Sequence, residues 1–148
     1  MTPSYAIHQV NGEAHVASLS FLQGACFPDD TLLPTDDGSW WWETTFAGEP
    51  VAFAAMSLIY DAEGTHAYLS RAGVVEAHRG HGLQRRLIDA RERLARKLGC
   101  RSLVTTTFCN PPSGNNLIKA GFALYDPEEP WGATGTNYWR KDLMTCFH

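Results

Sequence analysis

Residues 67–99 hold the pattern that most restricts how this 148-residue chain can fold. The apolar and β-branched stretch over 67–75 predicts a strand, and Gly80 and Gly82 follow it after a short connection. Behind them an amphipathic helix is predicted, ending at Gly99, with its arginines on the side opposite the apolar stripe. That stripe consists of Leu83, Leu87, Ala90, Leu94 and Leu98. Glycines and a helix start bring unpaired N–H groups together, so the segment predicts an anion site suited to a pyrophosphate.

The charge around this site leaves several readings open. Seven of the twelve basic residues lie between Arg79 and Lys97. They form either a solvated helix face or part of a polyphosphate site, and a helix cap or tight turn would also explain the two glycines. A dinucleotide fold would need a third glycine, and a P-loop would need Gly-Lys-Ser/Thr. Neither pattern is present, so both of these alternatives lose support.

The remainder of the chain predicts one mixed α/β domain over 1–148. Further strands are expected over 5–10, 40–46, 51–60, 101–107, 122–125 and 137–143. Helices are expected over 13–26 and 115–120, with a loop over 110–114. Strands and helices do not alternate along the chain, which argues against a doubly wound parallel sheet.

Composition narrows the classes of function. Apolar residues make up 44% of the chain, as in ordinary globular domains, and the net charge of −4 argues against general nucleic-acid binding. Cys26, Cys100, Cys109 and Cys146 show no CxxC spacing, so we expect reduced thiols and no metal site. No signal peptide and no apolar run of membrane length is found, and we expect a soluble, cytoplasmic protein without a membrane partner.

Two motifs resemble those of the GNAT superfamily of N-acetyltransferases. The sequence VVEAHRGHGL over 74–83 resembles the acyl-CoA motif, whose core is Arg/Gln-x-x-Gly-x-Gly/Ala: Arg79 and Gly82 match, whereas Gln84 departs from it. The sequence NPPS over 110–113, with a Gly-Phe pair eleven residues after the asparagine, resembles the family's second segment beside the coenzyme arm. The resemblance implies a central, mostly antiparallel, twisted sheet flanked by helices, with a bulged strand before the pyrophosphate loop and the long helix.

The resemblance also implies cofactor-binding roles, with acetyl-CoA as the acyl donor. The amides of His81, Gly82, Leu83 and Gln84 would hold the pyrophosphate, next to Arg79 and Gly80. The main chain of Gly73 and Val75 would run beside the pantetheine, and Asn110 and Ser113 would border it near the sulfur. An amide near Gly73 or Val74 would polarise the thioester carbonyl. Transfer would be direct, so Cys100 and Cys109 are expected to be bystanders.

The proton chemistry departs from the family pattern. Many members carry an acidic tyrosine at the position of Leu117, and a carboxylate where Ser70 and Arg71 stand. Tyr125 and Tyr138 are the candidate acids. The candidate bases are Asp29, Asp30, Glu43, His66 and His81.

Two further residues are expected to contact the acceptor. Arg71 could hold a carboxylate or phosphate, and Trp131 could form a pocket wall. The predicted reaction is acetyl transfer to a primary amine of a small molecule or peptide. Two alternatives stay open: a catalytically silent acyl-CoA-binding regulatory domain, and a nucleic-acid or protein interaction module built on the basic helix 85–97. The strand over 137–143 lies where family members often pair, which makes a homodimer one expectation.

Overall fold

A computed structural model of the chain describes residues 4–30 and 35–143, so Cys146 lies outside the described residues. The strands are β1 (Tyr5–Val10), β2 (Trp40–Phe46), β3 (Glu49–Asp61), β4 (Gly64–Val74), β5 (Ser102–Thr107), β6 (Ala123–Leu124) and β7 (Asn137–Asp142). The helices are α1 (Val16–Cys26), the 3-10 turn η1 (Glu76–His78), α2 (Leu83–Lys97) and α3 (Pro111–Lys119). None of these helices is long and apolar enough to cross a membrane.

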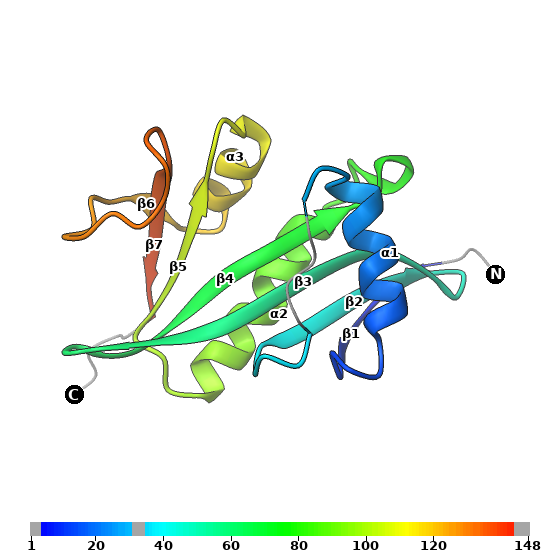
Figure 1. Cartoon of the computed structure of the whole chain (residues 1–148), viewed down its shortest axis with the longest axis horizontal. Coiled ribbons are helices and arrows are strands. Elements are labelled where there is room, and N and C mark those ends of the chain that lie inside the picture. Colours follow the sequence, from blue (N-terminus) through cyan, green and yellow to red (C-terminus); the bar gives the residue numbers. More distant parts are fainter. Residues whose placement is uncertain (1–3, 31–34, 144–148) are drawn as a thin grey trace.

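The described strands form one sheet in the order β1-β2-β3-β4-β5-β7-β6 (Figure 1). Only β4 and β5 run parallel, and all other neighbours are antiparallel. Helix α1 crosses one face of this sheet and α2 crosses the other (Figure 1). The predicted fold class, a mostly antiparallel sheet flanked by helices, is therefore confirmed.

Two helices begin elsewhere than the sequence predicts. Helix α1 starts at Val16 rather than at position 13, because Asn11 turns the chain: its side chain accepts from the Ala14 N–H at 2.9 Å. Helix α3 starts at Pro111, where a loop was expected over 110–114. Asn110 caps the helix, because its side chain accepts a hydrogen bond from the Ser113 N–H. Proline is tolerated in the first turn, since N–H groups there have no partner within the helix.

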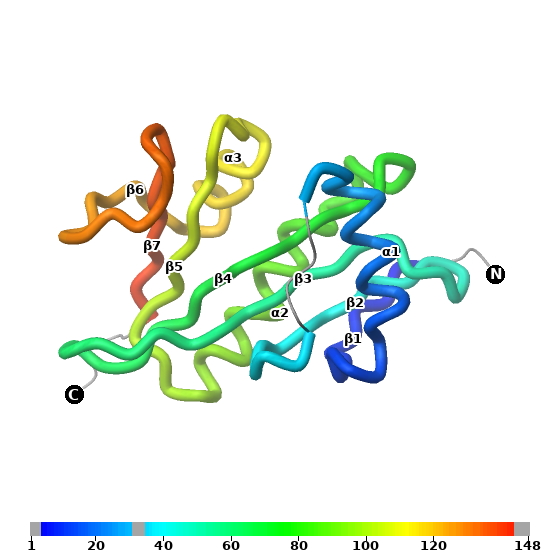
Figure 2. The backbone as a smooth tube through the Cα atoms, viewed as in Figure 1, coloured from blue at the N-terminus to red at the C-terminus, as the bar shows by residue number. Residues whose placement is uncertain are grey.

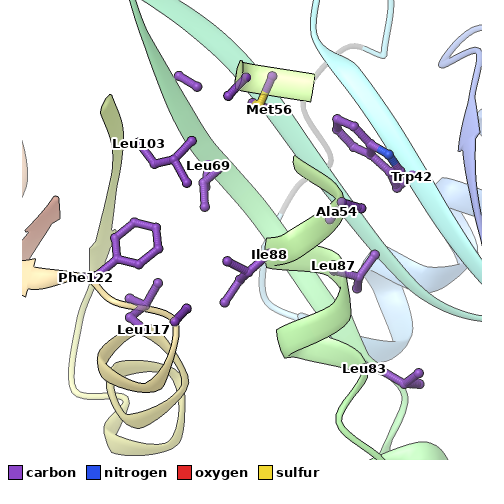
Figure 3. Packing of buried hydrophobic residues seen from close by; sticks show 14 of the residues in the cluster. Trp42, Ala54, Met56, Leu69, Leu83, Leu87, Ile88, Leu103, Leu117 and Phe122 are labelled. Carbon is purple, nitrogen blue, oxygen red and sulfur yellow. The ribbon is translucent and has the colours of Figure 1, made fainter. Parts of the chain in front are cut away.

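The central strand β3 is buried on both sides, with alternate residues serving two cores. Ala54 and Met56 pack toward α2 and contact the cluster that contains Leu87 and Ile88 (Figure 3). Phe53 and Ala55 point the other way, into a smaller cluster with Leu19 and Leu22 of α1. Strand β3 thus anchors both helices to the sheet.

A β-bulge changes the phase of β4. Ala55 of β3 pairs with Arg71, but the next residue, Met56, pairs with Leu69, so Ser70 is the extra residue. Leu69 belongs to the α2-side core, whereas the Arg71 guanidinium reaches Gln23 of α1. Without the extra residue Arg71 would share the face of Leu69. The bulge therefore turns Arg71 onto the α1 side and confirms the predicted bulged strand.

Strands β4 and β5 pair over a short stretch only. Their register covers three residue pairs, from His66↔Ser102 to Tyr68↔Val104. One residue further along β5, the Thr105 hydroxyl still donates to the Leu69 carbonyl at 2.7 Å. Beyond this point the two strands diverge, and β5 continues beside β7 (Figures 1 and 2). The divergence leaves a gap that opens toward α3 and the start of α2.

Gly73 allows α1 to approach the sheet closely. A Cβ atom at this position would lie 2.9 Å from the Cys26 side chain and 2.9 Å from the Phe53 ring. We expect Gly73→Ala to lower the free energy of unfolding by about 1–3 kcal/mol, because the tightly packed helix would have to move. Chemical denaturation would measure this change. Gly24→Ala, in a helical site with no atom within 4 Å of the added Cβ, is the matched control and should stabilise the protein by about 0.5–1 kcal/mol. Equal effects of the two substitutions would contradict the packing role.

Candidate functional site

Two adjoining cavities occupy the gap and its mouth. The loop cavity, of about 450 Å³, lies between the glycine loop, the end of α1 and the start of α3. The gap cavity, of about 490 Å³, lies between β4 and β5 and is also lined by α2 and α3. The residues that line both are Phe27, Ala72, Gln84, Asn110, Ser113 and Asn116. Because they share walls, the cavities form one groove that leads from the glycine loop into the sheet.

The glycine loop leaves backbone donors uncovered. Gly80 and Gly82 have φ values of 84° and 75°, a left-handed conformation that favours glycine. A Cβ atom at either position would meet no atom within 4 Å, so the space above the loop is open. Gly82 is the N-cap of α2 and supplies no side-chain acceptor, and the first turn holds no acidic residue. The N–H groups of Leu83 and Gln84, at the positive end of the helix dipole, are therefore available to an anion.

The basic residues expected around the loop have different surroundings. Arg79 lines the loop cavity and its Nε donates to the Val74 carbonyl at 3.0 Å, which ties the loop to β4. His81 does not line this cavity, and its ring lies 5.5 Å from the ring of Tyr5. Arg85 donates to the Lys119 carbonyl at 2.9 Å and so links α2 to the end of α3. His78, which the sequence reasoning missed, lines the loop cavity next to Arg79.

The open edge of β4 presents alternate amides to the gap. The Val75 N–H donates to the Val51 carbonyl of β3 at 2.9 Å. Since N–H directions alternate along a strand, the Gly73 amide also points to β3, and the amides of Ala72 and Val74 point to the gap. Of the two amides expected to polarise a thioester, Val74 thus has the suitable direction, whereas Gly73 serves the packing of α1. Strand alternation could have identified Ala72 from the sequence.

Asn110, Ser113 and Leu117 line the gap cavity along α3. Asn110 and Ser113 also line the loop cavity, and the Asn110 side chain holds the Ser113 amide at 3.2 Å. Leu117 is buried and forms a hydrocarbon wall where a tyrosine would supply a proton. The gap cavity therefore lacks an ionisable group at this position.

The candidate acids lie away from the gap. Tyr125 and Trp131 line a separate hollow of about 600 Å³, and the Trp131 ring stands 4.7 Å from the ring of Tyr138. The Tyr138 hydroxyl accepts from the Gly132 N–H at 2.9 Å and so anchors the loop before β7. Burial raises the pKa of Tyr125. The structure thus brings the three predicted aromatic residues together, but none of them lines the gap cavity or the loop cavity.

Among the candidate bases, Asp30 lines the gap cavity. Its Oδ2 lies 3.7 Å from Nη1 of Arg71, which lines the same cavity and also donates to Gln23. Glu43 is buried under α1, where it accepts hydrogen bonds from Ser18 and His15. Asp29 and His81 line neither of the two cavities. Asp30 is therefore the carboxylate best placed to take a proton in the gap.

His66 belongs to a different, structural cluster. It is buried, its Nδ1 lies 2.6 Å from the Ser102 hydroxyl, and its Nε2 lies 2.9 Å from Asp61. The ligand atoms of Asp61, Glu63 and His66 approach within 4.8 Å of one another, a spacing open to a metal ion. Both ring nitrogens are already engaged, however, so His66 has no lone pair to spare for a metal or for a substrate proton.

The cysteines differ in their access to the groove. Cys100 is buried in the α2-side core, and the exposed Cys109 lines neither cavity. Cys26 does line the loop cavity, and burial raises the pKa of its thiol. A raised pKa disfavours the nucleophilic thiolate, so direct transfer without a covalent enzyme intermediate remains the simpler prediction.

Arg91 is a site residue that sequence reasoning missed. It lies on the buried face of α2, four residues after Leu87, and not on the opposite side with the exposed arginines as expected. Its Nε donates to the Leu87 carbonyl, and its Nη1 donates to the carbonyls of Ala55 and Arg71 beside the bulge. Burial lowers its pKa to about 9. Because Arg91 also lines the gap cavity, it brings a buried positive charge to that wall.

The Asn110 cap can be tested apart from any ligand. We expect Asn110→Ala to lower the free energy of unfolding by about 1 kcal/mol, because the Ser113 N–H loses its acceptor. Asn110→Asp keeps the acceptor and should stay near the wild-type stability. Asn115→Ala, on the exposed face of the same helix, is the matched control for the change of residue type. Urea unfolding curves would measure all three, and an unchanged midpoint for Asn110→Ala would contradict the capping role.

Comparison with known proteins gives the same picture. The chain has the fold of the GNAT domain of S. lividans PAT (TM-score 0.73, 18% identity, 95% of this chain and 97% of that one). It is also similar to Arabidopsis thaliana NAA60 solved with a bisubstrate analogue, with a TM-score of 0.75 and 16% identity over 94% of this chain and 98% of that one. A third similar structure is that of the aminoglycoside N-acetyltransferase AAC(6')-Iy in complex with CoA, with a TM-score of 0.74 and 20% identity over 90% of this chain and 97% of that one. The model of the acetyltransferase (GNAT) family matches residues 6–122, and the chain therefore belongs to that family.

Proposed function

We propose that this protein transfers an acetyl group from acetyl-CoA directly to a primary amine of a small molecule or peptide. The observation that carries the proposal is the groove that runs from the open glycine loop at the start of α2 into the gap between β4 and β5. One end of the groove offers backbone donors to an anion, and the other offers β4 amides to a carbonyl. A thioester with a pyrophosphate-bearing tail needs both.

Family membership supports acyl transfer, and the solved relatives support the choice of donor and acceptor. AAC(6')-Iy is an N-acetyltransferase solved with CoA, and NAA60 was solved with a bisubstrate analogue. By analogy, the CoA tail would lie in the loop cavity and the reacting groups in the gap cavity. The expected setting is the cytoplasm, and pairing of two copies through β7 stays a prediction.

Different residues of the groove would bind the coenzyme, stabilise the transition state and accept the proton. The amides of Leu83 and Gln84 would hold the pyrophosphate, and Asn110 and Ser113 would border the arm that leads to the sulfur. The Val74 amide would donate to the thioester oxygen, where negative charge develops in the transition state. As the amine nitrogen bonds to the acyl carbon and the carbon–sulfur bond breaks, Asp30 would accept the amine proton, directly or through water.

A catalytically silent acyl-CoA-binding domain is the second candidate. It is favoured by the hydrocarbon wall at Leu117 and by the positions of Tyr125 and Tyr138 outside the groove. An interaction module built on helix 85–97 has less support. Arg85 and Arg96 pair with Asp89 and Glu92 along α2, so two of its exposed arginines already have a carboxylate partner.

Donor binding tests the proposal first. Acetyl-CoA at about a hundred times its dissociation constant should stabilise the fold by roughly 2.7 kcal/mol, visible as a rise in melting temperature of several degrees. ATP and NAD serve as controls for polyphosphate binding in general. A shift with acetyl-CoA, followed by acetylation within a panel of amines, supports the enzyme. A shift without turnover supports the silent domain, and no shift for a folded sample would contradict both.

Gly82→Val tests the pyrophosphate cradle. A branched side chain above the loop should obstruct the phosphates, so we expect the acetyl-CoA shift to be lost while the protein stays folded. Gly99→Val is the matched control at the other end of α2, since its φ of 77° and its open surroundings equal those of Gly82. Both variants carry the same backbone strain, and only the first should lose the ligand. Retained affinity in Gly82→Val would remove the loop from the binding site.

A further inference from the structure

Arg91 is a buried cation whose partners are all neutral. The residue is 3% exposed, and its three hydrogen bonds reach the carbonyl oxygens of Leu87, Ala55 and Arg71. No carboxylate among the described residues pairs with it, and its Nη2 has no hydrogen-bond partner there. A buried charge without a counter-charge is costly, and folded proteins commonly pair it or bring it to a ligand. Arg91 lines the gap cavity, so a ligand in that cavity would lie next to this residue.

The rest of the gap cavity does not neutralise this charge. Among its described lining residues are two arginines, Arg71 and Arg91, and one carboxylate, Asp30, whose Oδ2 is 3.7 Å from Arg71. The Nε atom of Arg71 is itself buried and has no hydrogen-bond partner. The other polar groups on the walls are neutral hydroxyls and amides, as in Thr105 and Asn116. The cavity therefore has an excess of positive charge and favours an anionic guest.

Arg91 also lies on the donor side of the cavity. Gln84, Ile88 and Arg91 form one stripe of α2, at spacings of four and three residues, and all three line the gap. The stripe starts at the proposed pyrophosphate site and ends at Arg91, which donates to the carbonyls of Ala55 and Arg71 beside the bulge. Ile88, in the middle of this stripe, belongs with Leu69 and Leu117 to the core cluster drawn in Figure 3. A group carried into the gap at the end of the coenzyme arm would therefore share this cavity with Arg91.

We propose that the gap cavity binds the terminal carboxylate of a dicarboxylic acyl group, such as malonyl or succinyl, through the Nη2 group of Arg91. This inference rests on the proposed function, since it assumes that an acyl-CoA occupies the groove. The cavity then accepts acetyl as well as longer acyl groups, and it binds a longer acyl group that ends in a carboxylate more tightly. A charge-assisted hydrogen bond between the guanidinium and the carboxylate supplies the preference.

Calorimetric titration of the full chain with CoA, butyryl-CoA and succinyl-CoA tests the proposal. Butyryl and succinyl groups both have four carbons, so the comparison isolates the carboxylate. We expect succinyl-CoA to bind at least about tenfold more tightly than butyryl-CoA. Equal affinities for the two acyl-CoA molecules, or weaker binding of succinyl-CoA, would overturn the inference. If CoA still bound in that case, the proposed function would be unaffected. Failure of CoA itself to bind would overturn both.

Variants then assign the preference to Arg91. Arg91→Met should abolish the difference between the two acyl groups and leave the affinity for CoA unchanged, whereas Arg91→Lys should keep part of the difference. Arg93→Met, at an exposed position two residues further along α2, should behave as wild type. A preference that survives in a folded Arg91→Met would overturn the assignment. If Arg91→Met does not fold, the affinities of the wild type and of Arg91→Lys for succinyl-CoA and butyryl-CoA still test the assignment. Loss of the contacts between Arg91 and the bulge would weaken the binding of both acyl groups alike, whereas loss of the carboxylate contact would weaken the binding of succinyl-CoA alone.

Discussion

The short parallel pairing between β4 and β5 is the feature on which the rest of this structure depends. Hydrogen bonding stops after three residue pairs, and the hydroxyl of Thr105 makes a last link to Leu69. Further pairing would close the sheet and leave no groove. The bulge at Ser70 lies directly beyond this link, so the strand changes phase where it becomes free. From there on, the amides of Ala72 and Val74 have no neighbouring strand, and a ligand can take its place.

Helix α2 contributes to both ends of the groove. Its first turn begins at a left-handed glycine and offers unpaired N–H groups, while its third turn places Arg91 under the bulge. Since Leu87 and Ile88 between them are packed against the sheet, the helix cannot shift without moving both ends together. The anion-binding end and the buried cation are therefore held at a fixed separation along one rigid element. That is the geometry required by a ligand with a phosphate at one end and a reacting group at the other.

Much of this arrangement could be predicted from the sequence, because periodicity and turn residues report on local structure. The strand before Gly80, the helix behind Gly82 and the antiparallel hairpin of β2 and β3 all follow from such patterns. Long-range relations could not be predicted in this way. Tyr125 and Tyr138 were chosen by residue type, and nothing local shows that the loop before β7 holds them in a separate hollow. Arg91 was assigned to the solvent side because arginine usually lies there, although its position four residues after Leu87 fits the buried stripe.

The chemistry of the gap follows from its charge more than from any single acid. A hydrocarbon wall at Leu117 cannot protonate a leaving thiolate, so a catalyst built on this groove has to stabilise negative charge in another way. Arg91, which is buried, and the β4 amides supply positive potential at the wall of the gap. Oxyanion and thiolate both carry the charge that this wall favours, and so does the carboxylate of a longer acyl group. An electropositive wall would therefore serve both the transfer that we propose and the proposed choice of acyl group, since both would draw on the Arg91 guanidinium, which has no counter-charge among the described residues.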